Sequence, residues 1–256
     1  MKEEVISVKN LSVGYKNQIV AKNISFSLGS GQFCAIVGIN GIGKSTLIRT
    51  LANLQSSLKG TVKLLEKYLN EYQSHELSRE QALVLTDPIA TKNLTVYELV
   101  ALGRQPHTNW IGSLSKKDIT QITASLAMFE LEGLQHRKCY ELSDGQLQRV
   151  LIAKAVAQDT PIIILDEPTT HLDLSNKVYI FKLLQNLAHK HKKTILFSTH
   201  EMDLAIQLCD KILILDALDN PFDDPCNLIE KGSFTHLFPN ELIEFDKKTG
   251  AFKVKK

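Results

Sequence analysis

The chain has 256 residues, 43% of them hydrophobic and 23% charged, which suits one or two globular domains with a hydrophobic core. A formal net charge of +2 argues against a nucleic acid or another strongly anionic partner. The four cysteines lack C-x-x-C spacing, so we expect reduced thiols in a cytosolic protein. The first ten residues lack the apolar segment of a secretory signal, and no run approaches the ~18 apolar residues of a membrane span. Any membrane role is therefore expected to depend on a partner.

The first 30 residues predict an antiparallel β layer. Short apolar runs lie at 5–8 and 24–28, and polar turns lie at 16–18 and 29–31. Tyr15 belongs to this layer, and taken alone it is most simply an aromatic side chain on a strand face.

Residues 33–54 predict a strand, a glycine-rich loop and a helix. Phe33–Val37 is an uncharged, mostly apolar run, and aliphatic residues recur at helical spacing after Lys44. The residues between fit G-x-x-x-x-G-K-[ST], the phosphate-binding P-loop: Gly38, Ile39, Asn40, Gly41, Ile42, Gly43, Lys44 and Ser45. In such a loop, backbone N–H groups surround a phosphate at a helix N-terminus. Lys44 would reach the terminal phosphates, and the Ser45 hydroxyl would bind Mg²⁺.

Residues 87–157 predict a helical insertion that comes after an apolar strand at 82–86. Two capping-box patterns, Thr95–Glu98 and Ser115–Asp118, each precede residues with helical periodicity. A third helix is predicted after Gly145.

Continuous apolar runs at 162–165, 194–197 and 211–215 predict central strands of a parallel sheet with covered faces. The first run ends in Asp166 and Glu167. A carboxylate at the end of a core strand beside a P-loop is the expected Mg²⁺ ligand, and Glu167 would polarise an attacking water as general base.

Two polar positions and the C-terminus have plain structural interpretations when each is taken alone. Ser143, within Leu142–Gln146, caps the helix that begins after it. His200, at the end of a strand, is most simply structural. The chain beyond 218 contains turn signals and a closing hairpin at 245–254, to which we assign no chemistry.

Together these motifs resemble the ATPase subunit of an ABC transporter, and the similarity covers nearly the whole chain. Residues 38–46 are similar to Walker A, 162–167 to Walker B, 142–146 to the signature motif, Asp173 to the D-loop, His200 to the switch histidine, and Tyr15 to the aromatic that stacks on adenine.

The resemblance implies an α/β fold with a P-loop NTPase (RecA-like) core. It also implies an N-terminal antiparallel β layer and a helical ABC-signature subdomain at about 87–157. The expected domains are an ABC ATPase domain at 1–218 and a small C-terminal extension at 219–256.

The resemblance further implies a head-to-tail pair of subunits that binds ATP and Mg²⁺. Each ATP would lie between the P-loop of one subunit and the signature loop of the other. The implied catalytic residues are Glu167, His200 and Lys44. The implied nucleotide-binding residues are Tyr15, Gly38, Asn40, Gly41, Gly43, Lys44, Ser45, Thr46, Ser143, Gly145, Gln146 and Asp173. The implied metal ligands are Ser45, Asp166 and Thr86.

Residues 95–104, with Pro106, His107 and 110–112, resemble the importers of metal chelates: ferric siderophores, haem and cobalamin. This subclass implies a peripheral location on the cytoplasmic face of the inner membrane. The implied partners are a multi-span permease and, indirectly, an external substrate-binding protein, with no nucleic acid. Two other classes stay open: a soluble ABC ATPase in cluster assembly or ribosome work, and a weakly hydrolysing regulatory ABC protein.

Two positions depart from the family pattern. Thr86, next to Asp87, stands where a glutamine normally contacts Mg²⁺ and water. Asp144 replaces the usual glycine of the signature loop. A carboxylate facing the γ-phosphate would repel it, so we expect Asp144 to turn outward and favour the first turn of its helix.

Overall fold

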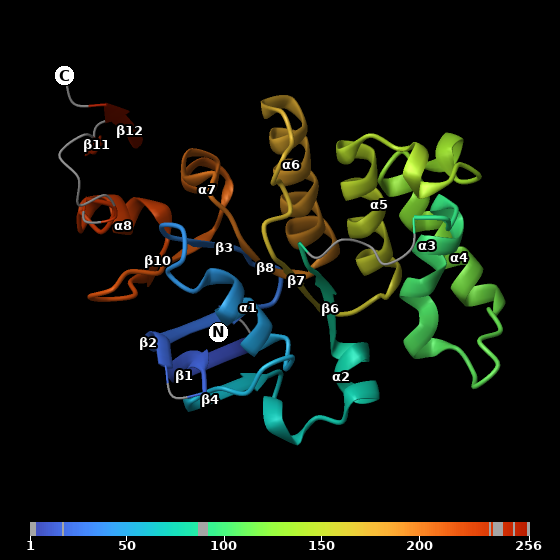
Figure 1. The fold of residues 1–256 in the computed structure, drawn as a ribbon, viewed down its shortest axis with the longest axis horizontal. Helices are drawn as coiled ribbons and strands as arrows, with labels where there is room; N and C mark the ends of the chain where they lie inside the picture. Colours follow the sequence, from blue (N-terminus) through green and yellow to red (C-terminus); the bar gives the residue numbers. More distant parts are fainter. Residues whose placement is uncertain are drawn as a thin grey trace.

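The computed structural model describes residues 4–16, 18–86, 92–235, 237, 243–247 and 249–254. Its centre is a six-stranded sheet in the order β10-β9-β3-β8-β7-β6 (Figure 1). These strands are β10 Phe222–Asp223, β9 Lys211–Ile214, β3 Phe33–Val37, β8 Thr194–Ser198, β7 Ile162–Leu165 and β6 Gln81–Val84. All neighbours pair in parallel except β10, which is antiparallel to β9. The parallel strands therefore end at one edge of the sheet, and the loops after them meet there.

The N-terminal layer is a four-stranded antiparallel sheet in the order β2-β1-β4-β5. Its strands are β1 Glu4–Tyr15, β2 Gln18–Gly29, β4 Lys59–Leu64 and β5 Lys67–Tyr68. The predicted antiparallel layer is thus confirmed, but β1 and β2 are longer than the apolar runs. Asn10 and Asn23 have φ of 49° and 57°, and the β1–β2 register shifts between Val8 and Leu11. Such bulges let a strand continue through polar residues.

Alternate residues of the central strands belong to two separate hydrophobic cores. Phe33, Ala35 and Val37 pack with α6 (Leu174–His191) and α7 (Met202–Leu208). Cys34 and Ile36 pack with the antiparallel layer and α1 (Lys44–Leu51). Figure 1 shows these layers on opposite sides of the central sheet. Because side chains alternate across a strand, continuous apolar runs predict this double burial.

Between β6 and β7 the described chain consists of helices joined by turns and loops. Residues 87–91, including Asp87 and the first part of the predicted insertion, lie outside the described residues. The elements here are α3 Val96–Ala101, η2 Leu102–His107, α4 Lys116–Met128, η3 Glu132–Leu134, η4 Cys139–Glu141 and α5 Asp144–Ala157. Other short helices are η1 Leu69–Glu71, α2 Ser74–Glu80 and α8 Pro225–Glu230. Thr95 and Ser115 cap α3 and α4 as the capping boxes predict.

A buried ion pair joins three of these helical elements. Arg104 is only 2% exposed; its Nε donates to Asp118 Oδ1 at 2.8 Å, and its Nη1 donates to the carbonyl oxygen of Ala157 at 2.8 Å. The ion pair therefore links η2, α4 and the end of α5.

The predicted C-terminal hairpin is present as β11 (Ile243–Asp246) paired with β12 (Ala251–Val254). Phe245 and Phe252 lie 5.0 Å apart, and Phe234 lies 5.0 Å from Phe245, between ring centroids. This cluster packs the hairpin against the larger core. The hairpin is therefore in contact with the main core through its two phenylalanines.

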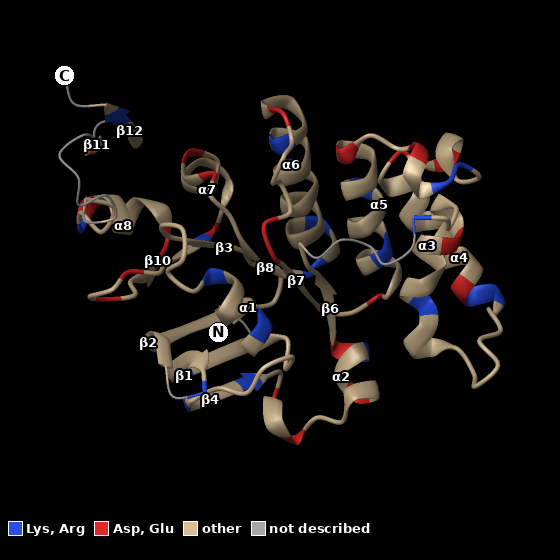
Figure 2. Cartoon of the chain, viewed as in Figure 1, with Lys and Arg blue, Asp and Glu red and all other residues tan. Residues whose placement is uncertain are grey.

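The cysteines are unpaired thiols that differ in burial. All four cysteines are free; Cys34, Cys139 and Cys209 are buried, whereas Cys226 on α8 is exposed. Basic and acidic residues are interspersed over the helices (Figure 2). Within the described residues, no helix combines the length and apolar character needed to cross a membrane.

Candidate nucleotide-binding site

The glycine-rich loop joins β3 to α1 at the edge where the parallel strands end. Gly43 has a φ of 113°, and a Cβ there would lie 2.8 Å from Cγ1 of Val20. A Cβ on Gly38 would lie 2.7 Å from the carbonyl oxygen of Leu215. Both positions therefore require glycine for steric reasons, independently of any ligand. The predicted strand–loop–helix context is confirmed, and α1 begins at Lys44 as predicted.

The Lys44 ammonium is folded back into the loop. Its Nζ donates to the carbonyl oxygens of Gly38 at 3.0 Å and Ile39 at 3.2 Å. Burial lowers the pKa of Lys44, and the nearby carboxylates of Glu167 and Asp166 oppose that shift. The ammonium thus faces the space that the loop encloses.

The Asp166 carboxylate lies next to the first turn of α1. Its Oδ1 accepts from Ser45 Oγ at 3.1 Å and from Ser198 Oγ at 2.6 Å. Ser198 Oγ also accepts from the backbone N–H of Glu167 at 2.9 Å. Ser198 was not predicted from the sequence; its signal is a hydroxyl at the end of β8, the strand beside β7. It fixes the Asp166–Glu167 turn relative to the neighbouring strand.

Glu167 and His200 form a close pair at the mouth of the same edge. His200 Nε2 lies 2.6 Å from Glu167 Oε1, and Thr170 Oγ1 donates to Glu167 Oε2 at 3.1 Å. Glu167 has a φ of 47°, a backbone region that non-glycine residues rarely adopt and that occurs often at functional sites. Both carboxylate oxygens of Glu167 are therefore oriented by neighbouring side chains.

These groups surround one cavity of about 390 Å³, which is lined by Asn40, Gly41, Gly43, Lys44, Ser45, Thr46, Glu167 and His200. Tyr15 lies beside it, with its hydroxyl 3.4 Å from Thr46 Oγ1 and 56% of the residue exposed. The ring is thus free to contact a flat ligand at the rim.

Thr86 and Asp144 line an adjoining cavity of about 380 Å³ that they share with Asp166 and Glu167. Asp144 is exposed and is the first residue of α5. With Leu147, Gln148 and Leu151 it occupies the face of α5 that looks toward the carboxylates of its own chain. Thr86 makes no hydrogen bond in the part of the chain that the structure describes.

The signature residues and the D-loop aspartate stand apart from the P-loop cavity. Ser143 caps α5: its Oγ accepts from the backbone N–H of Gln146 at 3.3 Å, and its own N–H donates to Gln146 Oε1 at 3.1 Å. Gly145 approaches Asn176 so closely that a Cβ would lie 3.3 Å from its side chain. Asp173 caps α6 by accepting from the backbone N–H of Asn176 at 2.8 Å. None of the predicted site residues here lines the P-loop cavity.

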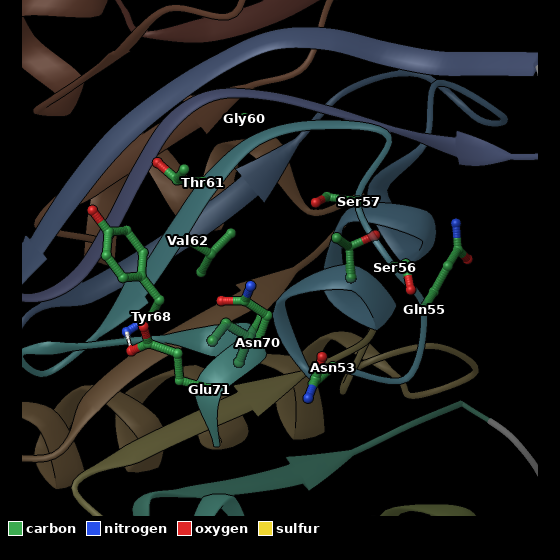
Figure 3. Close-up of a pocket in the computed structure, with 12 residues that line it drawn as sticks. Asn53, Gln55, Ser56, Ser57, Gly60, Thr61, Val62, Tyr68, Asn70 and Glu71 are labelled. Carbon is green, nitrogen blue, oxygen red and sulfur yellow. Dashed lines mark hydrogen bonds between the residues drawn. The ribbon is translucent and has the colours of Figure 1, made fainter. Parts of the chain in front are cut away.

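Two further cavities help to delimit the site. The cavity in Figure 3, of about 370 Å³, lies between the end of α1 and β4, and contains none of the predicted residues. Another, of about 570 Å³, adjoins the P-loop through Gly38–Asn40 and reaches His200, Leu174 and Phe252. The C-terminal hairpin therefore borders the site, which the sequence did not predict.

The donor set at Ser45 and Asp166 suits Mg²⁺. A hydroxyl and a carboxylate provide oxygen ligands, and Mg²⁺ bound with a nucleotide needs only one or two carboxylates because phosphates and water complete its shell. Among the described residues, no group of three or more histidines, cysteines and carboxylates is arranged to hold a metal alone. The site therefore fits a metal that enters together with phosphates.

A family model described as ABC transporter matches residues 21–170, which include the P-loop, the signature residues and the Asp166–Glu167 turn. The chain belongs to the ABC transporter family. As an ABC ATPase it binds nucleotide and hydrolyses ATP, and its fold is the α/β P-loop NTPase fold that the sequence predicted.

Three proteins that are similar to this ABC ATPase have more specific descriptions. The achromobactin transport ATP-binding protein of Dickeya dadantii is 36% identical over 208 residues, 81% of this chain and 77% of that protein. An inward-facing ABC transporter described as metal-chelate type matches with a TM-score of 0.80 and 29% identity, over 98% of this chain and 95% of the other. A bacterial ABC transporter cassette solved as a dimer matches with a TM-score of 0.71 and 30% identity, over 82% and 94%.

Proposed function

We propose that this ABC ATPase drives the uptake of a metal chelate, a ferric siderophore, haem or cobalamin, through a membrane permease. The similarity to an achromobactin transport protein and to a transporter of metal-chelate type supports the substrate class. The observation that carries the hydrolytic role is the Glu167–His200 pair, 2.6 Å apart, on the cavity that Lys44 and Ser45 also line.

In this proposal Lys44 exchanges the carbonyl oxygens of Gly38 and Ile39 for the terminal phosphates of ATP. Ser45 and Asp166, with Thr86 nearby, hold the Mg²⁺ that neutralises phosphate charge. Tyr15 stacks on the base, and the N–H groups of Asn40, Gly41, Gly43 and Thr46 surround the phosphates.

Glu167 acts as the general base in this proposal. Its carboxylate takes the proton of the attacking water, and His200 holds the water and the γ-phosphate in line. A base placed in this way contributes about 10²–10⁴-fold to the rate. Thr170, at 3.1 Å, keeps the second carboxylate oxygen oriented.

The signature residues act in trans in this proposal. Ser143, Gly145, Gln146 and Asp173 lie outside the P-loop cavity of their own chain, and ABC cassettes form dimers. A second copy in head-to-tail orientation brings these four residues to the nucleotide. The N–H groups at the start of α5 then face the γ-phosphate, since first-turn N–H groups have no partner within the helix.

The remaining assignments belong to the same proposal. Residues 1–218 form the ATPase domain, with a helical subdomain at about 87–157, and 219–256 form a C-terminal extension. The protein is peripheral on the cytoplasmic face of the inner membrane and contacts a multi-span permease, which an external substrate-binding protein supplies.

Affinity purification of the tagged protein from detergent-solubilised native membranes, with mass spectrometry of co-eluting proteins, tests this function. A multi-span permease in the eluate is the expected result, and transport of the candidate chelates is then measured with that permease. A soluble assembly factor, or protein that stays in the cytosol alone, would move the assignment to a soluble ABC ATPase.

A weakly hydrolysing regulatory protein is the second candidate, and the specific observation that favours it is Asp144. This carboxylate shares a cavity with Asp166 and Glu167, where like charges repel. An ATPase assay of the purified protein, beside the Asp144→Gly variant, separates the two. An increase of more than tenfold in the variant would favour the regulatory candidate.

A further inference from the structure

An ion pair joins the start of α6 to the turn that carries His200. Lys177 Nζ donates to Glu201 Oε1 at 2.6 Å, and the two side chains are 23% and 29% exposed. Among the described residues, no other hydrogen bond or ion pair joins the first turns of α6 to residues 199–202.

Each end of this ion pair is rigidly connected to a predicted site residue. The backbone N–H of Lys177 donates to the carbonyl oxygen of Asp173 at 2.9 Å, so Lys177 moves with the D-loop aspartate. Glu201 comes directly after His200, and its N–H donates to Thr199 Oγ1 at 3.0 Å. The N–H of Met202 donates to the carbonyl oxygen of His200 at 3.0 Å, so these residues form one tight turn.

The space beside the pair is open rather than packed. Leu174, His200 and Glu201 all line the cavity of about 570 Å³ that adjoins the P-loop. Met202 and Ala205 are buried in the same core as Ile180 of α6, so apolar packing holds the two helices together. The ion pair adds a directional contact at the open side, next to His200.

The placement of Lys177 is unfavourable for the helix alone. It is the fourth residue of α6, and a cation near a helix N-terminus is disfavoured by the helix dipole. The ion pair with Glu201 compensates for this unfavourable position of Lys177.

We propose that Lys177 and Glu201 are positioning residues that couple the location of Asp173 to the alignment of His200 with Glu167. Docking of a second copy against the start of α6 then orients the histidine through this pair. The inference rests on the proposed roles of His200 and Asp173. It predicts an effect on the chemical step and not on nucleotide affinity, because neither residue lines the P-loop cavity.

The test is a charge-swap cycle in the full chain: Lys177→Glu, Glu201→Lys and the double variant, with Lys177→Arg as the conservative change. We expect each single reversal to lower kcat for ATP about tenfold with KM within about twofold, a coupling of the size measured for residues in contact. The double variant and Lys177→Arg should recover most of the wild-type kcat.

The matched control is the same swap at Lys67 and Glu76, whose ion pair of 2.8 Å lies in and beside the antiparallel layer. That swap should leave kcat unchanged. Thermal unfolding of Lys177→Glu adds a second readout, because an anion at the start of α6 favours the helix. A slower but equally stable variant cannot owe its loss of rate to a weakened helix.

Unchanged kcat in both single reversals, or a double variant no faster than the singles, would overturn the inference. A loss of kcat that only parallels a loss of folded protein would overturn it as well. His200→Ala is measured alongside: if it leaves kcat unchanged, the proposed role of His200 has failed, and that failure is distinct from an inert ion pair.

Discussion

The P-loop edge and the start of the signature helix are built in opposite ways. At the P-loop edge, Lys44, Ser45, Asp166, Glu167 and His200 are hydrogen-bonded within the loop or to neighbouring loops and strands. At the start of α5, Ser143 is satisfied by Gln146 of its own helix, and the residues around it are exposed or half-exposed. In the proposed function, the P-loop edge is the half of the site that the chain assembles itself, and the start of α5 is the half that it presents to a second copy.

Different contacts hold these two regions in place. The P-loop edge is positioned by strands that belong to both hydrophobic cores. The signature helix α5 contributes to the larger core, and the Arg104–Asp118 ion pair joins its end to η2 and α4. A substitution in this ion pair should therefore affect the helices around α5 more than the P-loop edge.

The largest effect is expected from Glu167→Gln, a substitution at the P-loop edge. ATP hydrolysis should fall about 10²–10⁴-fold, or about 3–5 kcal/mol in the activation free energy, because glutamine cannot accept the proton of the water. ATP binding should persist, since the amide keeps the size of the side chain. Phosphate release and equilibrium nucleotide binding measure the two effects, with exposed Glu132→Gln as control. Turnover within about tenfold of wild type would refute the general-base role.

Arg104→Met should destabilise the helices that hold the signature helix α5 in place. Removing the guanidinium leaves the Asp118 carboxylate, only 3% exposed, without its cation, which costs about 3–5 kcal/mol in the free energy of unfolding. Lys67→Met, at a more exposed pair, should cost less than about 1 kcal/mol. Denaturant unfolding measures both. Equal losses in the two variants would mean that the buried pair does not hold these helices together.

The same ion pair gives this region a pH dependence. Hydrogen bonding from the Ser115 hydroxyl, helped by Arg104 and opposed by burial, lowers the pKa of Asp118 to about 2 from 3.8. Because the folded pKa is the lower one, the stabilisation is complete above about pH 4 and is lost as the pH falls from about 4 toward about 2. Asp118→Asn should remove this part of the acid-unfolding profile.

The smallest effect is expected from Ser143→Ala, which removes the N-cap side chain of α5. Thr95→Ala is its match, because Thr95 caps α3 with the same capping box and accepts from Glu98 N–H at 3.1 Å. Each loss of a cap should cost about 1 kcal/mol of stability. ATP hydrolysis should fall several-fold only in Ser143→Ala, since only Ser143 is proposed to reach the partner's nucleotide. Similar rates in the two variants would argue that Ser143 is a cap and nothing more.

The sequence predicted the parts of the molecule that are set by local pattern. The P-loop, the carboxylates after β7 and the histidine after β8 each come at the end of an apolar run, so their arrangement at one sheet edge could be inferred. Their roles in catalysis and binding stay predictions, as does the domain division.

The parts that were missed depend on contacts distant in sequence. Ser198 and Thr170 are single hydroxyls without a motif, and only the pairing of β7 with β8 gives Ser198 its importance. Asp118 was identified as a cap, but its buried partner Arg104 lies 14 residues away and could not be told from a solvated charge. The long strands β1 and β2 were underestimated because asparagine bulges interrupt the apolar alternation.

The unequal burial of the four thiols gives the protein a built-in attachment point for spectroscopy. Burial raises the pKa of Cys34 and Cys209, so few thiolates form there, and Cys139 is also buried. A maleimide fluorophore should therefore label Cys226 on α8 alone. Energy transfer between two such labels would report the approach of two copies during turnover in the unmutated chain.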